Sequence, residues 1–170
     1  MDVTLQVLVS GLAAGAIYGL VGVGHSLVYR LTGVVHFAFG ELIALAVFAT
    51  LFLAAGTAPV TSESVGGGRF LLAVAGGLAI AAAASAGSYW FAVQPYQLRG
   101  STNGWVGASL AVAFALRTLI VAVFDRPSYV LPDPLPFRDL GDEGFWHVGG
   151  ATIQARSLFV IAVALALAAA

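Results

Sequence analysis

The chain alternates between long uncharged runs and short polar segments. Three runs contain no charged residue: Val3–Tyr29 (27 residues), Leu42–Ser62 (21 residues) and Phe70–Leu98 (29 residues). A helix of about 20 apolar residues spans the roughly 30 Å of hydrocarbon in a bilayer, so each run is long enough to cross a membrane. The pattern therefore predicts a membrane protein with several spans.

The segments between the runs divide the chain into elements. Gly and Ser residues in Thr57–Arg69 favour a loop, Gln94–Gly104 is a short polar link, and the four Pro residues of Asp125–Arg156 prevent a helix there. We predict an all-α polytopic membrane fold, a helical bundle with about four complete transmembrane helices and the start of a fifth, at residues 5–29, 34–55, 70–93, 105–124 and 157–170.

The last predicted helix has only 13 uninterrupted apolar residues, from Leu158 to Ala170. Because this is shorter than a span, we expect residues 1–170 to be the N-terminal part of one longer transmembrane domain. The acidic start, Met1-Asp2, differs from the basic start of a signal peptide, so we expect the first helix to be retained.

Composition supports the membrane assignment and excludes other classes. The chain is 60% hydrophobic and 9% charged, with a mean hydropathy of +0.97, whereas a soluble domain carries about 25% charge. A net charge of −1 with no Lys argues against a nucleic-acid binder. The absence of Cys excludes a disulfide scaffold and a Cys-ligated metal site within these residues.

Three glycines in the first predicted helix are spaced four residues apart. Gly11, Gly15 and Gly19 form a Gly-x-x-x-Gly-x-x-x-Gly ladder, which presents a flat face that another helix can approach closely. Such ladders are common in polytopic proteins, so this one indicates helix packing and little more.

Glu41 is the only acid within a predicted span. A charge at that depth costs roughly 2.5–3.5 kcal/mol on insertion scales, so Glu41 should face the bundle interior. Two roles are open: a gate or pathway residue at a break in the second helix, or a carboxylate that stabilises the first turn of the helix that follows. His36, which lies in the same stretch, is a second pathway candidate.

Arg117 is the third pathway candidate, seven residues from the end of its helix. We expect it to snorkel to the nearer interface or to bond a backbone carbonyl. An ion pair with Glu41 would be strained, because simple hairpin threading places the two residues at different depths. His25, His36 and Glu41 miss the i, i+4 spacing of helical metal ligands, so no metal site is expected.

Three stretches in order resemble branched-chain amino acid ABC transporter permeases. The first is the Gly-rich Gly11–Leu20 with Ile17-Tyr18, and it leads into His36-Phe37-Ala38-Phe39-Gly40-Glu41, where the family has Asn-Phe-Ala-His-Gly-Asp/Glu. Here His36 replaces the Asn and Phe39 the His. The others are Tyr96–Gly100, which is similar to the family's Tyr-Arg-Pro-Leu-Arg-Gly link, and Gly149–Ile153, which resembles the segment before its fifth helix.

This resemblance implies a permease subunit of an importer in the bacterial plasma membrane. Such a subunit pairs with a second permease subunit and with cytoplasmic ATPase subunits, which use the ATP, and receives substrate from an extracytoplasmic substrate-binding protein. The chain itself would bind no cofactor and would contact membrane lipid. The resemblance places 125–156 outside, where four acids become candidates for docking the binding protein: Asp133, Asp139, Asp142 and Glu143.

Other functions stay open on the sequence alone. Related permeases carry urea or short amides, and the altered His36 and Phe39 weaken the transfer of substrate specificity from the family. An intramembrane enzyme would need a nucleophile and a base at matching depth, and the adjacent His25 and Ser26 point about 100° apart on a helix. The distribution of Arg residues leaves the membrane orientation undecided.

Overall fold

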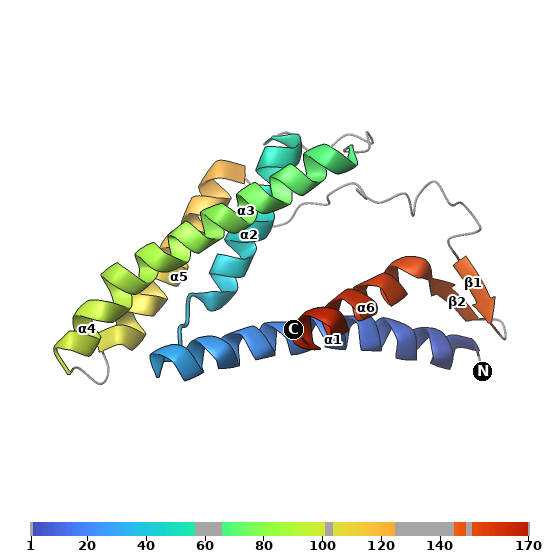
Figure 1. Cartoon of the computed structure of the whole chain (residues 1–170), viewed down its shortest axis with the longest axis horizontal. Helices are drawn as coiled ribbons and strands as arrows, with labels where there is room; N and C mark the ends of the chain where they lie inside the picture. Colours follow the sequence, from blue (N-terminus) through green and yellow to red (C-terminus); the bar gives the residue numbers. More distant parts are fainter. Residues whose placement is uncertain (1, 57–65, 101–103, 125–144, 149–150, 170) are drawn as a thin grey trace. The chain divides into compact units, whose positions relative to one another are not determined.

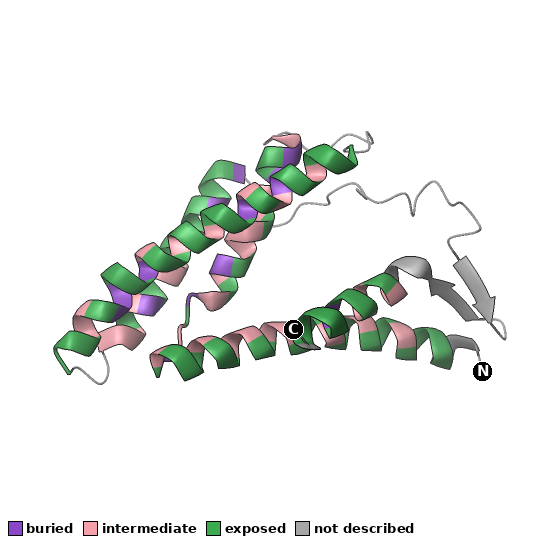
Figure 2. Cartoon of the chain, in the orientation of Figure 1, coloured by how far each residue is buried: buried purple, intermediate pink, exposed green. Residues whose placement is uncertain are grey.

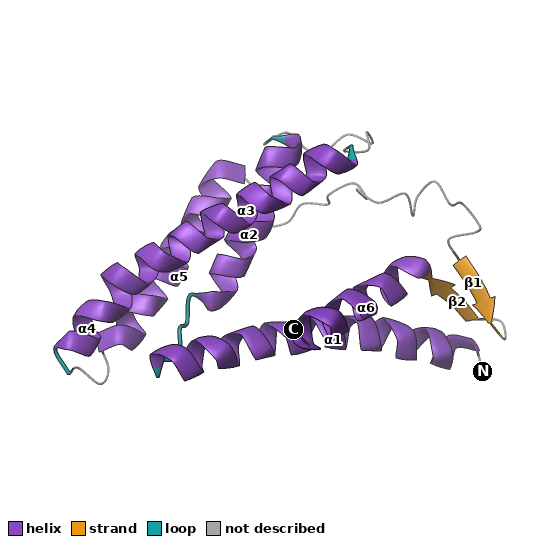
Figure 3. Cartoon of the chain, viewed as in Figure 1, coloured by secondary structure: helices purple, strands orange, loops and turns teal. Residues whose placement is uncertain are grey.

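The computed structural model describes residues 2–56, 66–100, 104–124, 145–148 and 151–169 (Figure 1). Most of these residues are helical, and eight of them form a two-stranded antiparallel sheet (Figure 3). The elements in chain order are α1 (Asp2–Thr32), α2 (Phe39–Ala55), α3 (Gly67–Ser88), the π-helix η1 (Tyr89–Val93), α4 (Gln94–Leu98), α5 (Gly104–Phe124), β1 (Phe145–Val148), β2 (Ala151–Gln154) and α6 (Ala155–Ala169).

The chain divides into two compact units, residues 1–33 with 135–170 and residues 34–134. In the first unit α6 packs against α1, and the hairpin of β1 and β2 leads directly into α6. The hairpin register pairs Phe145 with Gln154 and Val148 with Ala151. Half-buried positions of α1 recur every three or four residues, which is the spacing of one helix face, at Val9, Ala13, Ala16 and Leu20.

The second unit contains α2, α3, η1, α4 and α5. α3 runs antiparallel to α2, because Gly76 lies against Leu53 and Gly77 lies against Thr50 of α2. α5 runs parallel to α2, since the ring of Phe124 packs against those of Phe48 and Phe52, with centroids 4.9 and 6.4 Å apart. A small apolar cluster of Leu51, Ile120 and Phe124 marks the core of this contact.

Many large apolar side chains of the helices are exposed. Most of the helical residues coloured in Figure 2 are exposed or half-buried. Phe91 is 83% exposed and Leu31 is 79% exposed. Three helical segments are long and apolar enough to cross a membrane, namely Thr4–Thr32, Gly67–Leu98 and Gly104–Phe124. A surface of this kind suits hydrocarbon rather than water, so the chain is a helical membrane protein.

Several predicted boundaries differ from the structure. The second helix begins at Phe39 rather than at residue 34 and has 17 residues, and α3 already begins at Gly67, within the predicted loop. Gln94–Leu98, predicted as a polar link, is helical, because Pro95 lies in the first turn of α4, where a missing N–H costs little. Within the predicted polar segment Asp125–Arg156, Ala151–Gln154 form β2.

Candidate functional site

The helical path is interrupted between α1 and α2. Gly33 ends α1 with φ +68°, a left-handed conformation that glycine adopts without strain, and its N–H donates to the Tyr29 carbonyl at 2.7 Å. Val34 and Ala38, which are 6% and 0% exposed, anchor the segment that follows. Irregular backbone of this kind is tolerated at membrane depth only where protein or water satisfies its polar groups.

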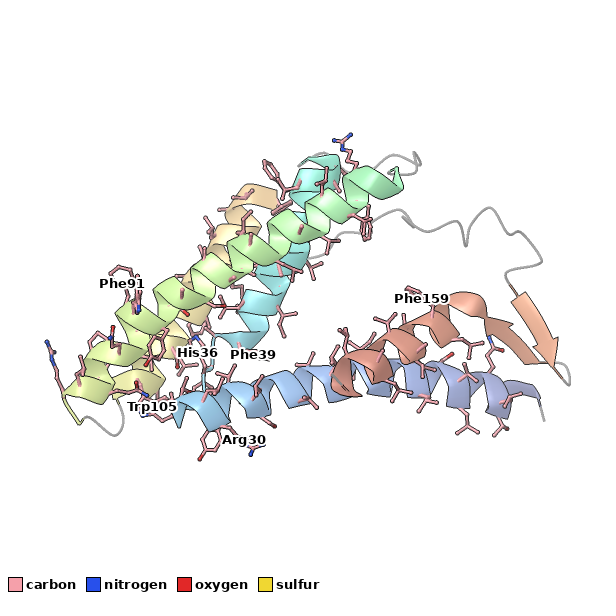
Figure 4. The ribbon with its side chains drawn as sticks, viewed as in Figure 1. Arg30, His36, Phe39, Phe91, Trp105 and Phe159 are labelled. Carbon is pink, nitrogen blue, oxygen red and sulfur yellow. The ribbon has the colours of Figure 1, made fainter. Side chains whose placement is uncertain are left out.

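His36 lies in this interruption and bonds to the far end of α3. Its Nε2 is 3.1 Å from Ser88 Oγ, and Ser88 Oγ donates to the Ser85 carbonyl at 2.8 Å. A hydroxyl has one proton, so Nε2 of His36 must be the donor and Ser88 Oγ the acceptor. Figure 4 labels His36 in the segment that leads into α2. Ser88 is 7% exposed, so this hydrogen bond is sheltered from solvent.

The π-helix η1 begins directly after Ser88. A π-turn holds more residues than an α-turn and rotates everything that follows, and such turns are frequent at functional sites. In η1 the side chains of Ala92 and Val93 are buried, whereas Phe91 points away from the other helices (Figure 4). Tyr89 donates its hydroxyl to Gln97 Oε1 at 3.2 Å, which ties the start of η1 to α4.

α5 completes this end of the unit. The rings of Phe37 and Trp105 stack with centroids 6.5 Å apart, so the interrupted segment contacts the first turn of α5. Ser109 is 0% exposed and donates to the Val106 carbonyl at 3.0 Å. The interruption is thus held at both α3 and α5.

In the first turn of α2, Glu41 approaches Arg117 of α5. The guanidinium Nη1 is 4.0 Å from the carboxylate Oε1, and the two side chains are 70% and 28% exposed respectively. This separation is longer than the 2.7–2.9 Å of a charge-assisted hydrogen bond, so the two ions attract each other without direct bonding.

The sequence left a Glu41–Arg117 ion pair possible but strained, because simple hairpin threading places the two residues at different depths, and in the structure the two side chains do approach each other. α2 begins five residues later than predicted, and Phe124 at the end of α5 packs against Phe48 and Phe52, which lie seven and three residues before the end of α2. α2 is therefore displaced along α5. At 1.5 Å per residue, Arg117 lies about 10 Å from the C-terminal end of α5, and Glu41 lies about 21 Å from the C-terminal end of α2. The displacement brings the two charges together.

The structure limits how Glu41 can stabilise α2. The N-cap of α2 is Ala38, and no side-chain hydrogen bond caps the helix there. Glu41 lies in the first turn, so what remains is its attraction to the positive end of the helix dipole, worth about 0.3–1 kcal/mol.

Two further sets of predicted site residues lie elsewhere in the chain: three glycines of α1 and four acids of the segment 125–156. Gly11, Gly15 and Gly19 are exposed in α1, and within the described chain no atom lies within 4 Å of a Cβ built on them. Their predicted role in helix packing stays a prediction. The four acids proposed for docking lie outside the described residues: Asp133, Asp139, Asp142 and Glu143. No group of three metal-ligating side chains occurs among the residues described.

Sequence reasoning missed two contact residues of the second unit, Ser88 and Gly77. Ser88 is 52 positions from His36, and nothing in the local pattern links them. Gly77 lies in a run of small residues, where only the folded structure distinguishes the glycine that touches another helix.

Comparison of the chain with protein-family models, curated proteins and solved structures gave no match.

Proposed function

We propose that the chain is the N-terminal part of the membrane-spanning permease subunit of an ATP-binding-cassette importer for branched-chain or other small amino acids. The observation that carries the proposal is the Glu41–Arg117 ion pair between two apolar helices, α2 and α5, directly after an interrupted segment. Charges inside a membrane are costly and mark solute pathways by default, and transporters build their sites where helices are discontinuous.

The resemblance narrows this general assignment to one family. Its clearest motif, His36–Glu41, coincides with the interruption and with the first turn of α2. In the proposal the finished subunit crosses the bacterial plasma membrane several times. In this chain α1, α2, the segment 67–98 and α5 would cross it, and α6 would begin a fifth span.

The partners follow from the same family. A second permease subunit, cytoplasmic ATPase subunits and an extracytoplasmic binding protein would complete the importer, with residues 125–156 on the outside. We propose that this chain is not itself an enzyme. The His36–Ser88 pair supports this, because a serine nucleophile needs a histidine that accepts its proton, whereas His36 donates.

The proposal is tested by transport. The full-length protein, reconstituted with its ATPase and binding-protein partners in proteoliposomes, should accumulate radiolabelled L-leucine only when ATP is supplied to the ATPase side. Omitting the permease is the control. Accumulation of urea or acetamide without leucine would favour the amide permease instead. ATP hydrolysis by the purified permease alone would contradict the proposal that only the ATPase subunits hydrolyse ATP.

A further inference from the structure

The Glu41–Arg117 pair leaves both charges open to a further ligand. The ions are 4.0 Å apart, and 70% of the Arg117 side chain and 28% of the Glu41 side chain remain exposed. A guanidinium has five N–H donors and a carboxylate accepts about four hydrogen bonds. At 4.0 Å, the pair leaves most of these donors and acceptors for other groups.

The open face of Arg117 is not suited to lipid. The residue lies about 10 Å inside α5, within an apolar run whose neighbours Phe114 and Val121 are themselves 69% and 42% exposed. An arginine at such depth faces water or a polar group, because hydrocarbon cannot solvate it. On this otherwise apolar side of α5, the guanidinium of Arg117 beside Glu41 is therefore the part expected to meet water or a bound polar group.

We propose that Glu41 and Arg117 form a binding site for the zwitterionic head of an amino acid in transit, an inference that rests on the proposed function. The carboxylate of Glu41 binds the α-ammonium group, and the guanidinium of Arg117 binds the α-carboxylate. These two groups of an amino acid are attached to one carbon, so they lie roughly 3 Å apart by standard bond lengths and match two opposite charges separated by 4.0 Å.

Charge complementarity selects the class of ligand. A cation is attracted by Glu41 but repelled by Arg117, and an anion meets the reverse. An uncharged amide must compete with the mutual attraction of the two ions and offers no charge in return. Only a zwitterion gives each ion a new partner, so the site favours it over its singly charged analogues.

The test measures which charge of the ligand each residue recognises. The full-length permease with its ATPase subunits, in nanodiscs and without binding protein, is titrated with radiolabelled L-leucine against two competitors. L-leucinamide lacks the carboxylate, and 4-methylpentanoate lacks the ammonium group. Arg117→Gln should reduce the preference for leucine over leucinamide by about tenfold or more, and Glu41→Gln should do the same for 4-methylpentanoate.

Two further variants serve as controls. Arg117→Lys keeps the charge and should retain most of the preference. Arg99→Gln removes one positive charge at the end of α4, outside the pair, and should leave both preferences unchanged. Each variant is compared at equal amounts of assembled complex.

The outcomes separate this inference from the proposed function. Unchanged preferences in both Gln variants, or no leucine binding by a wild-type complex that transports leucine with its partners, would overturn the zwitterion site and leave the importer intact. Failure of the wild-type complex with its partners to transport leucine would overturn the importer itself.

Discussion

Gly77 sets how closely α3 approaches α2. A Cβ at this position would lie 2.8 Å from the Ala46 carbonyl oxygen and 2.9 Å from Thr50 N, and still closer to Thr50 Oγ1. Because two of these atoms belong to the backbone, a methyl group cannot be accommodated by a rotamer change. The helices would have to separate.

We therefore expect Gly77→Ala to lower the stability of the second unit by about 1–3 kcal/mol, the usual cost of overpacking. Gly87→Ala in the same helix is the matched control, because no described atom lies within 4 Å of a Cβ built there. Thermal unfolding of the detergent-solubilised protein compares the two. Equal shifts in melting temperature would contradict the close contact.

The hydrogen bond from His36 to Ser88 joins the interrupted segment to α3. Ser88→Ala removes the acceptor and leaves the sheltered His36 N–H to find another, so we expect a loss of about 0.5–2 kcal/mol. The same substitution in a His36→Leu background should cost little, because the partner is already absent. Ser26→Ala is the control, since Ser26 bonds only within its own helix in the contact described, to Gly22 O at 2.8 Å. Additive losses in the double variant would exclude the pairing.

The two roles of Glu41 predict different effects of Glu41→Gln in the assembled importer. If Glu41 lies on the pathway, leucine uptake per assembled complex falls while the affinity of the binding protein for leucine is unchanged. If it serves only the helix dipole, uptake per complex is preserved and thermal stability falls by about 0.3–1 kcal/mol. Radiolabelled uptake normalised to complex measures the first effect, and unchanged uptake would remove Glu41 from the pathway.

At the scale of elements, the interruption before α2 depends on Gly33. Its φ of +68° costs a residue with a Cβ roughly 1–2 kcal/mol. Gly33→Ala should therefore lower the melting temperature, whereas Gly22→Ala, in a helical and open position, should not. A neutral Gly33→Ala would mean that α1 continues past Thr32.

The sequence predicts the helices better than their ends. Length and hydropathy dominate in a bilayer, so the uncharged runs were enough to locate α1 and α3, and α5 was located from the apolar residues on both sides of Arg117. The end at Val93 was misplaced because Gln94–Gly104 is polar and indicates a link, although Pro95 is tolerated in the first turn of α4. Nothing in Tyr89–Val93 itself predicts a π-helix, which depends on packing of Ala92 and Val93.

Within the candidate site, the sequence identifies the charges but not their pairing. Glu41 and Arg117 stand out because they interrupt apolar runs, a purely local signal. Their approach depends on where α2 begins and on how far it is displaced along α5, and both are properties of the folded unit. Ser88 carries no local signal, since a serine in a helix among alanines is unremarkable until His36 is placed beside it.

At the scale of the whole molecule, the described helices expose many large apolar side chains, as expected of a protein surrounded by hydrocarbon. Buried residues are few, and they lie mainly where α2, α3, η1 and α5 meet in the second unit. Glu41 and Arg117 are the charged residues of α2 and α5. A substrate path at these two residues requires that their surroundings are aqueous in the membrane.

Single-cysteine accessibility tests this claim most directly. Residues 1–170 contain no Cys, so Arg117→Cys and Leu119→Cys each introduce one thiol into this part of the chain. Leu119 is 53% exposed and lies about 200° around the helix from Arg117, which makes it a control on the opposite face. In membrane vesicles the account predicts that a membrane-impermeant thiol reagent labels Arg117→Cys, more slowly in the presence of leucine, and leaves Leu119→Cys unlabelled. Equal labelling of the two, or none at Arg117→Cys, would contradict a water-accessible path at the Glu41–Arg117 pair.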